Sequence, residues 1–185
     1  MLSLFFGGYK MASSLVVNTD TYISLADCDV YLSAQYVSTD AKLTAWNALL
    51  DGDCDVYLRQ AAAIIDAHPL QGFKALTTQT MGFPRILYTD ANYLLNSNVR
   101  VLDEGGFYTQ PAVPAAVKNA QCELALELAQ GTTSQASQRA ELQRQGVRSY
   151  SIGKLSETLT GASADIVSYK ARQMLLPFTG GGFRI

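Results

Sequence analysis

The chain has 185 residues, of which 48% are hydrophobic, and its 14 Lys and Arg against 16 Asp and Glu give a formal net charge of −2. This length fits one domain, which can bury roughly 70% of its unfolded surface without disulfides or metals. The small net charge and high apolar fraction exclude disorder for most of the chain. They also leave no positive excess for a polybasic nucleic-acid binder.

The first 19 residues are expected to form a weakly ordered leader. Their apolar run has no basic residue before it and no cleavage-type stretch after it, so it does not match a signal peptide. No window of the sequence approaches 18 apolar residues, so we expect no membrane span. These features predict an intracellular protein.

Helix signals dominate the first part of the chain. Ser24 and Asp27 have the spacing of a capping box, which predicts a helix from this point. A short helix is expected around Thr44–Leu50, and it would carry the only Trp, Trp46. Three Asp residues at alternate positions from residue 51 favour the start of a third helix, which Pro69 ends.

Residues 71–112 lack sustained periodicity and contain several Gly, Pro and Asn, which predicts a long meandering loop. A loop of this length in a compact domain is usually functional. Pro114 then suits the first turn of the next helix, and Gly131 suits its C-terminal end. A further helix is expected from about Ser137 to Gln145.

The C-terminal part is predicted to contain a hairpin near residues 147–160, because apolar residues alternate on both sides of Gly153-Lys154. Ser163 is expected to cap a last helix that ends before Pro177. The glycine-rich residues 177–185 are then a flexible tail with apolar anchors. The fold class is therefore mainly α: a small helical bundle over residues 20–176, with one hairpin, a long inter-helix loop and a flexible C-terminal tail.

No set of residues supports catalysis, so we expect no enzyme and no cofactor. His68 is the only histidine, and it stands at a helix end. Gly153-Lys154 lacks the upstream glycine of a phosphate loop. Asp51–Asp55 lacks the glycine and glutamate positions of a calcium loop. The cysteines match no zinc module and are expected to be buried thiols; they are Cys28, Cys54 and Cys122.

Charge is distributed unevenly along the chain. Residues 1–70 hold three basic and eight acidic side chains, whereas residues 71–185 hold eleven basic and eight acidic ones. Such a chain can present opposite charges to neighbouring copies or partners, or the pattern reflects chance. The basic part also interleaves aromatic with cationic residues, which suits either single-stranded nucleic acid or a protein interface.

Five segments match, in order, the motifs of a known family. They are Tyr22–Tyr31, Tyr57–Asp66, Gly72–Lys74, Gln79–Arg85 and Val113–Ala125. Their patterns resemble the S-x-A-D-A-D-x-Y opening, the L-R-x-A-T-x-x-I-D helix, the Q-x-L-x-W-P-R loop and the I-P-x-x-V-x-x-A-x-x-E-x-A helix of the head–tail connector (adaptor) proteins of tailed bacteriophages. Many members carry the label DnaT-like single-stranded DNA-binding protein. The resemblance covers about residues 20–130, with Met81 and Phe83 where the family has Leu and Trp.

The resemblance implies a virion structural protein at the neck, assembled in the host cytoplasm. Such proteins form a homo-oligomeric ring, twelvefold like the portal protein that it contacts, with a tail or second adaptor protein below it. Double-stranded DNA passes through the channel, and no membrane is involved. The alternative is a single-stranded DNA-binding replication accessory protein.

Four groups of residues are candidates for contacts. A tail that touches the portal or a neighbouring copy is expected at Phe178, Phe183, Arg184 and Ile185. An inter-subunit hairpin is expected at Val147, Tyr150, Ile152, Leu155 and Leu159. The family-motif loop contains Gln79, Phe83, Pro84 and Arg85, which we interpret as packing residues rather than DNA contacts. The basic residues that could face DNA are Arg148, Lys154 and Arg172.

Overall fold

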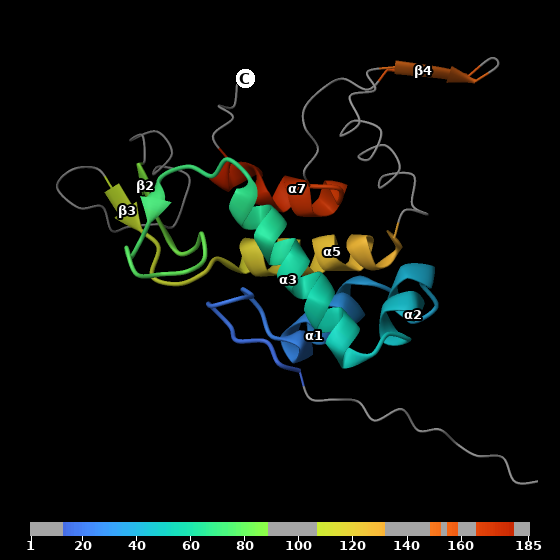
Figure 1. Cartoon of the computed structure of the whole chain (residues 1–185), viewed down its shortest axis with the longest axis horizontal. Coiled ribbons are helices and arrows are strands. Elements are labelled where there is room, and N and C mark those ends of the chain that lie inside the picture. The colour runs from blue at the N-terminus through green and yellow to red at the C-terminus, as the bar shows by residue number, and fades with distance from the viewer. Residues whose placement is uncertain (1–12, 89–106, 132–148, 153–154, 159–165, 180–185) are drawn as a thin grey trace, which may run out of the picture.

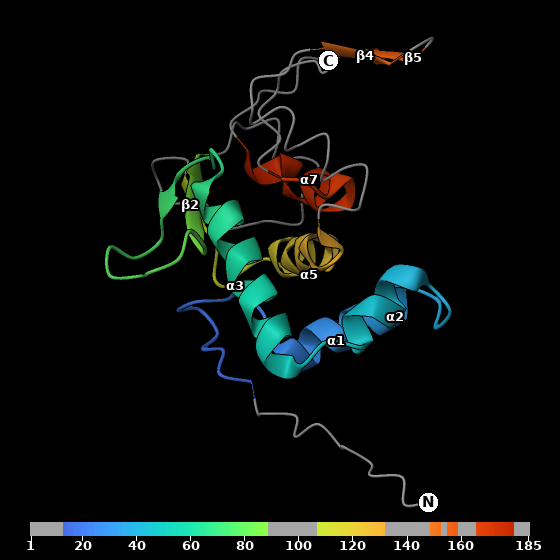
Figure 2. The ribbon, with the colours of Figure 1, turned by 45° about the vertical axis from the view of Figure 1, so that its right-hand side comes forward.

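The computed structural model describes residues 13–88, 107–131, 149–152, 155–158 and 166–179, and the fold of these residues is mainly helical, as the sequence predicts (Figure 1). The α-helices are α1 (Leu25–Gln35), α2 (Ala41–Asn47), α3 (Asp51–Ala67), α5 (Ala115–Ala129) and α7 (Tyr169–Leu175). Helix α5 packs against all four others. It lies between α7 on one side and α1 with α2 on the other, while α3 crosses these layers (Figure 2).

The first two helices begin at polar side chains that accept backbone hydrogen bonds. Ser24 Oγ accepts the N–H of Asp27 at 3.1 Å and donates its own hydroxyl to the Asp27 carboxylate at 2.7 Å, which confirms the capping box. The second helix was expected at Thr44 but begins at Ala41. The reason is Asp40, whose Oδ1 accepts the N–H groups of Lys42 and Leu43 at 2.8 and 3.3 Å.

The two longest helices begin and end near the predicted residues. Helix α3 starts at Asp51, with Asp51 and Asp53 in its first turn, and His68 follows its last residue. Helix α5 follows Pro114, and Gly131 lies just beyond its end with a φ of +63°. That backbone conformation strongly favours glycine.

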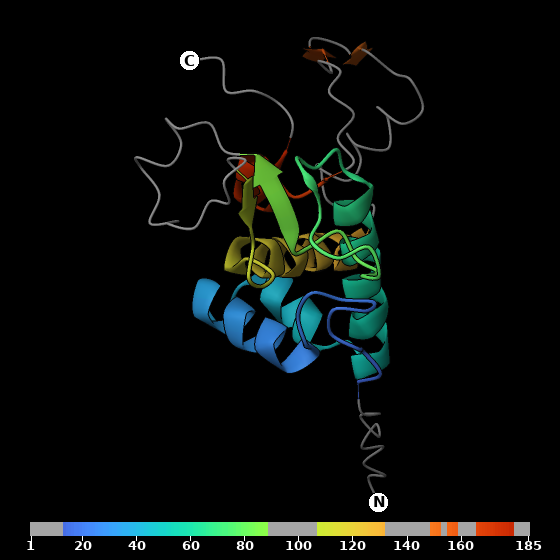
Figure 3. The ribbon, with the colours of Figure 1, turned by 90° about the vertical axis from the view of Figure 1, so that its left-hand side faces the viewer.

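The prediction of one long loop over residues 71–112 is wrong, because this region contains a three-stranded antiparallel sheet (Figure 3). Its strands are β1 (Phe73–Lys74), β2 (Arg85–Tyr88) and β3 (Phe107–Thr109), in the order β1-β2-β3. Phe73 pairs with Ile86, and Ile86 pairs with Thr109. With two and three residues, β1 and β3 are too short to show a period-two pattern in the sequence.

The predicted hairpin is confirmed. Strand β4 (Ser149–Ile152) pairs antiparallel with β5 (Leu155–Thr158), and the pair Ile152 and Leu155 closes the turn side. Figures 1 and 2 place this hairpin away from the helices. Several predicted features lie outside the described residues: the helix over Ser137–Gln145, the cap Ser163, and the contact residues Val147 and Leu159.

The last helix and the tail differ from the prediction. Helix α7 begins at Tyr169, because Ser168 Oγ accepts the N–H of Ala171 at 3.3 Å. A 3₁₀ helix, η2 (Leu176–Phe178), continues it through Pro177. The ring of Phe178 packs edge-on against Phe83, with centroids 5.4 Å apart. Phe178 therefore belongs to the core rather than to a free tail.

The core is centred on α5. Every residue of that helix from position 120 to 127 is buried, which is typical of a helix surrounded by others. The three cysteines are buried and form no disulfide, as predicted. The leader is anchored from residue 13 on, because Ser13 Oγ and the Ser14 N–H donate to the buried Asp55 carboxylate at 2.6 and 2.7 Å. Among the described residues, no helix is both long enough and apolar enough to span a membrane.

Candidate interaction surfaces

The sequence motifs meet in a buried polar network. Gln121 on α5 accepts the backbone N–H of Tyr22 at 2.9 Å, and its amide donates to Thr21 Oγ1 at 2.7 Å and to the Leu58 carbonyl at 2.8 Å. These partners come from the opening segment and from α3. One side chain, fully buried, thus joins segments about 60 to 100 positions apart in the chain.

Asp66, near the end of α3, joins the same opening segment to the motif loop. It accepts a hydrogen bond from the Tyr22 hydroxyl, and the Gly82 N–H donates to Asp66 Oδ2 at 3.1 Å. A Cβ at Gly82 would stand 2.7 Å from Asp66 Oδ1, so any larger residue there would displace the Asp66 carboxylate. Burial, followed by the hydrogen bond with Asp66, raises the pKa of Tyr22.

Arg85 holds the motif loop together. Its guanidinium donates to the carbonyls of Gln71, Gly72 and Gly82 at 2.6 to 3.0 Å, and only 9% of the residue is exposed. Gln79 donates to the carbonyl of Pro84 at 3.0 Å, while Phe83 is buried. The family-motif loop therefore makes intramolecular contacts. The Arg85 guanidinium is buried in them and is not available to contact DNA.

Two carboxylates on α5 bind cations from the neighbouring helices. Glu123 accepts hydrogen bonds from the hydroxyls of Tyr31 and Tyr36 at 2.9 and 2.5 Å and from Lys170 Nζ at 2.8 Å. Glu127 pairs with Lys42 at 2.5 Å. These contacts tie α1, α2 and α7 to α5. The sequence does contain a signal for them, since two acids interrupt the otherwise apolar second half of α5, residues 122–129, but their partners are not predictable from spacing.

Large apolar side chains remain exposed on several elements. The most exposed are Tyr169 at 75%, Phe73 and Val30 at 71%, and Val37 at 70%. Phe73 lies on β1, an edge strand of the three-stranded sheet. Tyr169 and the exposed Arg172 stand one turn apart on α7. Exposed apolar groups of this size are common at protein interfaces, although single ones also occur on ordinary surfaces.

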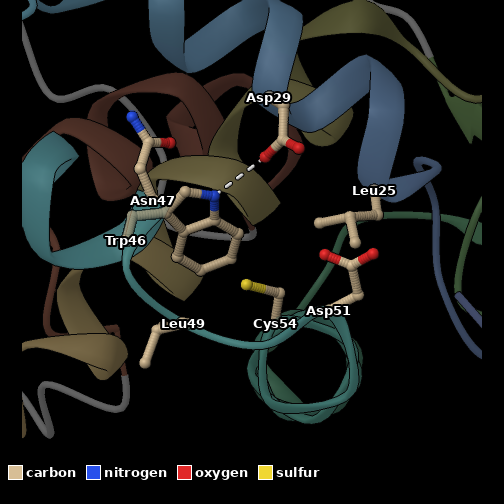
Figure 4. A pocket seen from close by; sticks show the side chains of 7 residues that line it. All are labelled: Leu25, Asp29, Trp46, Asn47, Leu49, Asp51 and Cys54. Atoms are coloured by element: carbon tan, nitrogen blue, oxygen red, sulfur yellow. Dashed lines mark hydrogen bonds between the residues drawn. The ribbon is translucent and has the colours of Figure 1, made fainter. Parts of the chain in front are cut away.

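A cavity of about 210 Å³ lies where α1, the end of α2 and the start of α3 meet (Figure 4). Its lining residues are Leu25, Asp29, Trp46, Asn47, Leu49, Asp51 and Cys54. The Trp46 indole N–H donates to Asp29 Oδ1 at 2.9 Å. No pattern in the sequence indicates this cavity, because it depends on how three helices pack. No group of three metal-ligating side chains occurs among the described residues.

The predicted contact residues are only partly described. Arg172 is exposed on α7, and the hairpin positions Tyr150, Ile152 and Leu155 lie in β4 and β5. The remaining candidates fall outside the described residues; they are Val147, Arg148, Lys154, Leu159, Phe183, Arg184 and Ile185. The inter-subunit and DNA-facing roles of all these residues stay predictions.

Comparison with known proteins gives one match. A family model described as "Putative DnaT-like ssDNA binding protein" matches residues 12–185. No similar protein was found among curated proteins, and none among solved structures. The family description names single-stranded DNA binding and does not name a virion component.

Proposed function

This chain belongs to the family of putative DnaT-like ssDNA-binding proteins, and from that premise we propose that it is a non-enzymatic assembly protein that acts through contacts with copies of itself. In its specific form the proposal is a head–tail connector: a ring, twelvefold like the portal, joining portal to tail around double-stranded DNA. The family description itself favours a second candidate, single-stranded DNA binding, which is treated below.

One observation carries the assembly proposal: five of the seven Lys and Arg side chains in the described residues, all but Lys118 and Arg172, have acceptors within the chain. Lys42, Lys170 and Arg59 pair with carboxylates, and Arg85 is enclosed by carbonyls. Lys74 Nζ donates to the carbonyls of Gln79 and Thr80 at 3.3 and 2.9 Å. Binding to a phosphate backbone requires cations that can neutralise phosphates, so this body is a poor source of them.

Exposed apolar side chains support the same proposal. Val30, Val37 and Phe73 are each at least 70% exposed. Apolar and aromatic groups anchor protein interfaces, whereas a backbone-tracking DNA groove depends on charge. The ordered motif resemblance to phage connectors supplies the ring and the portal as the expected form of assembly.

Electron microscopy tests this proposal. We expect ring-shaped particles from the purified protein, alone or mixed with the portal protein of the same phage, and ring density at the neck of virions. Native mass measurement gives the number of copies. A protein that stays monomeric beside its portal, with no neck density in virions, contradicts the connector function.

Single-stranded DNA binding is the second candidate, favoured by the family description and by one feature of α7. Tyr169 and Arg172 are both exposed there and stand three residues apart, so an aromatic ring and a guanidinium share one helix face. Bases stack on aromatic rings, and cations neutralise phosphates. The basic residues Arg148 and Lys154 could extend such a surface.

Fluorescence anisotropy with a labelled oligothymidine tests this second candidate. Binding that weakens steeply with salt, and weakens further in Tyr169→Ala or in a triple alanine variant at Arg148, Lys154 and Arg172, supports it. Gln173→Ala, on the same helix, is the matched control. No detectable binding at moderate salt contradicts DNA binding and leaves the assembly proposal standing.

A further inference from the structure

The cavity beside Trp46 has room for an organic group. Its volume is about 210 Å³, whereas a water molecule occupies about 30 Å³ in the liquid. Two carboxylates, an amide, a thiol and an indole line it together with two leucines. Figure 4 shows Asp29, on α1, and Asp51, at the start of α3, on the same side of the cavity.

Asp29 differs from the ion-paired carboxylates of the described residues in the charge of its partner. Asp20, Glu123 and Glu127 each pair with a Lys or Arg of the same chain. Asp29 instead accepts from the neutral indole N–H of Trp46. An ionised carboxylate has about four acceptor sites, so this hydrogen bond orients the group without neutralising it.

The chemistry of the lining selects an organic cation. A metal ion is disfavoured. Two Asp and a Cys line the cavity, but among the described residues no three such side chains are placed so that they could hold a metal ion together. A guanidinium has N–H donors that point in several directions and can serve carboxylates on two different helices.

We propose that this cavity binds the guanidinium of an arginine from a second copy of the chain. This proposal rests on the proposed assembly function and specifies one contact between two copies of the chain. Charge complementarity supports the second copy as the source, since residues 1–70, which build the cavity, hold eight acidic and three basic side chains. Residues 71–185 hold eleven basic side chains, most of them Arg, which can supply the cation.

The single tryptophan makes the cavity directly observable. Trp46 is the only Trp of the chain, so its fluorescence reports on the cavity without interference from other indoles. The first experiment titrates the full chain with arginine amide at constant ionic strength. Citrulline amide, which has nearly the same shape but a neutral ureido group in place of the guanidinium, is the control ligand. We expect a saturable change with arginine amide and none with citrulline amide.

Two variants test which side chains bind the cation. Asp29→Asn keeps an acceptor for the Trp46 N–H and removes only the charge, so the fold is preserved. Asp29→Asn and Asp51→Asn should each weaken binding by at least about fivefold. Asp53→Asn is the matched control, because it removes a charge from the same first turn of α3 without lining the cavity. Equal binding by Asp29→Asn, or an equal response to citrulline amide, overturns the cation site.

The second experiment tests the source of the arginine. Sedimentation should show weaker self-association for the Asp29→Asn, Asp51→Asn double variant than for the wild type and for Asp53→Asn. Unchanged association of the double variant overturns the second copy as the source. If the wild type itself never associates, the assembly function fails in its own test, while the arginine amide titration still decides whether the cavity takes a guanidinium.

Discussion

Arg85 is a nearly buried side chain that holds the motif loop together. Its guanidinium donates to carbonyls of Gln71, Gly72 and Gly82. Arg85→Met should lower the free energy of unfolding by about 2 to 4 kcal/mol, because the carbonyls lose a charged donor in a buried place. Urea denaturation followed by circular dichroism measures this. Arg172→Met, on an exposed residue of α7, should stay within about 0.5 kcal/mol of the wild type.

Tyrosine ionisation is expected to destabilise the protein at alkaline pH. Burial raises the pKa of Tyr22, Tyr31 and Tyr36 in the folded state, and hydrogen bonds to Asp66 or Glu123 raise it further. A raised folded pKa means that the stabilisation is fully present below the unfolded value of about 10. It is lost as the pH rises above that value, with a slope of up to about 1.4 kcal/mol per pH unit for each such group.

Urea denaturation between about pH 8 and pH 11 checks this alkaline loss. Tyr36→Phe should reduce the slope above pH 10, since one group no longer has to ionise on unfolding. Tyr169→Phe changes an exposed ring and serves as the control. A free energy of unfolding that stays constant up to about pH 11 would contradict the assignment.

Individual positions were predictable where the chemistry is local. The hydrogen bonds of Ser24 and Asp27 follow from their spacing alone, and the burial of three cysteines outside any disulfide follows from composition. Glu123 and Gln121 were not predictable in this way. Their partners belong to other helices, and no periodicity in α5 indicates which helices those are.

At the scale of elements, the packing of Phe178 against the core shows that the predicted tail does not begin at Pro177. Phe178→Ala should lower the free energy of unfolding by about 1 to 3 kcal/mol, because it removes a half-buried ring from contact with Phe83. A chain shortened after Thr179 keeps that ring and should unfold at the wild-type urea concentration. If the shortened chain is equally stable but binds the portal more weakly, residues 180–185 make the contact; equal portal binding contradicts the tail proposal.

Helices were predicted better than strands, and the reason is length. Helix α3 spans 17 residues and repeats its apolar stripe several times, so its limits could be read closely. Strand β1 has two residues and is defined by pairing with β2 rather than by its own sequence. The cavity beside Trp46 is even less predictable from the sequence, because it exists only where three helices pack.

For the whole molecule, the uneven charge distribution predicts salt-dependent association. Residues 1–70 contain eight acidic and three basic side chains, whereas residues 71–185 contain eleven basic and eight acidic ones. We expect self-association, measured by sedimentation, to weaken as salt rises from 0.1 M to 1 M, where the screening length falls from about 10 Å to about 3 Å. Association that strengthens with salt would instead identify the exposed apolar side chains as the main contact.

Gln121 has a consequence for how the protein is made. Its side-chain amide bonds Thr21, Tyr22 and Leu58 to α5. During synthesis these residues therefore have no Gln121 to bond to until residue 121 has left the ribosome. Helices α1 to α3 emerge earlier with their apolar faces uncovered, and they are then exposed to chaperones and to one another. Synthesis that pauses between the codons for residues 70 and 115 would prolong this unprotected interval.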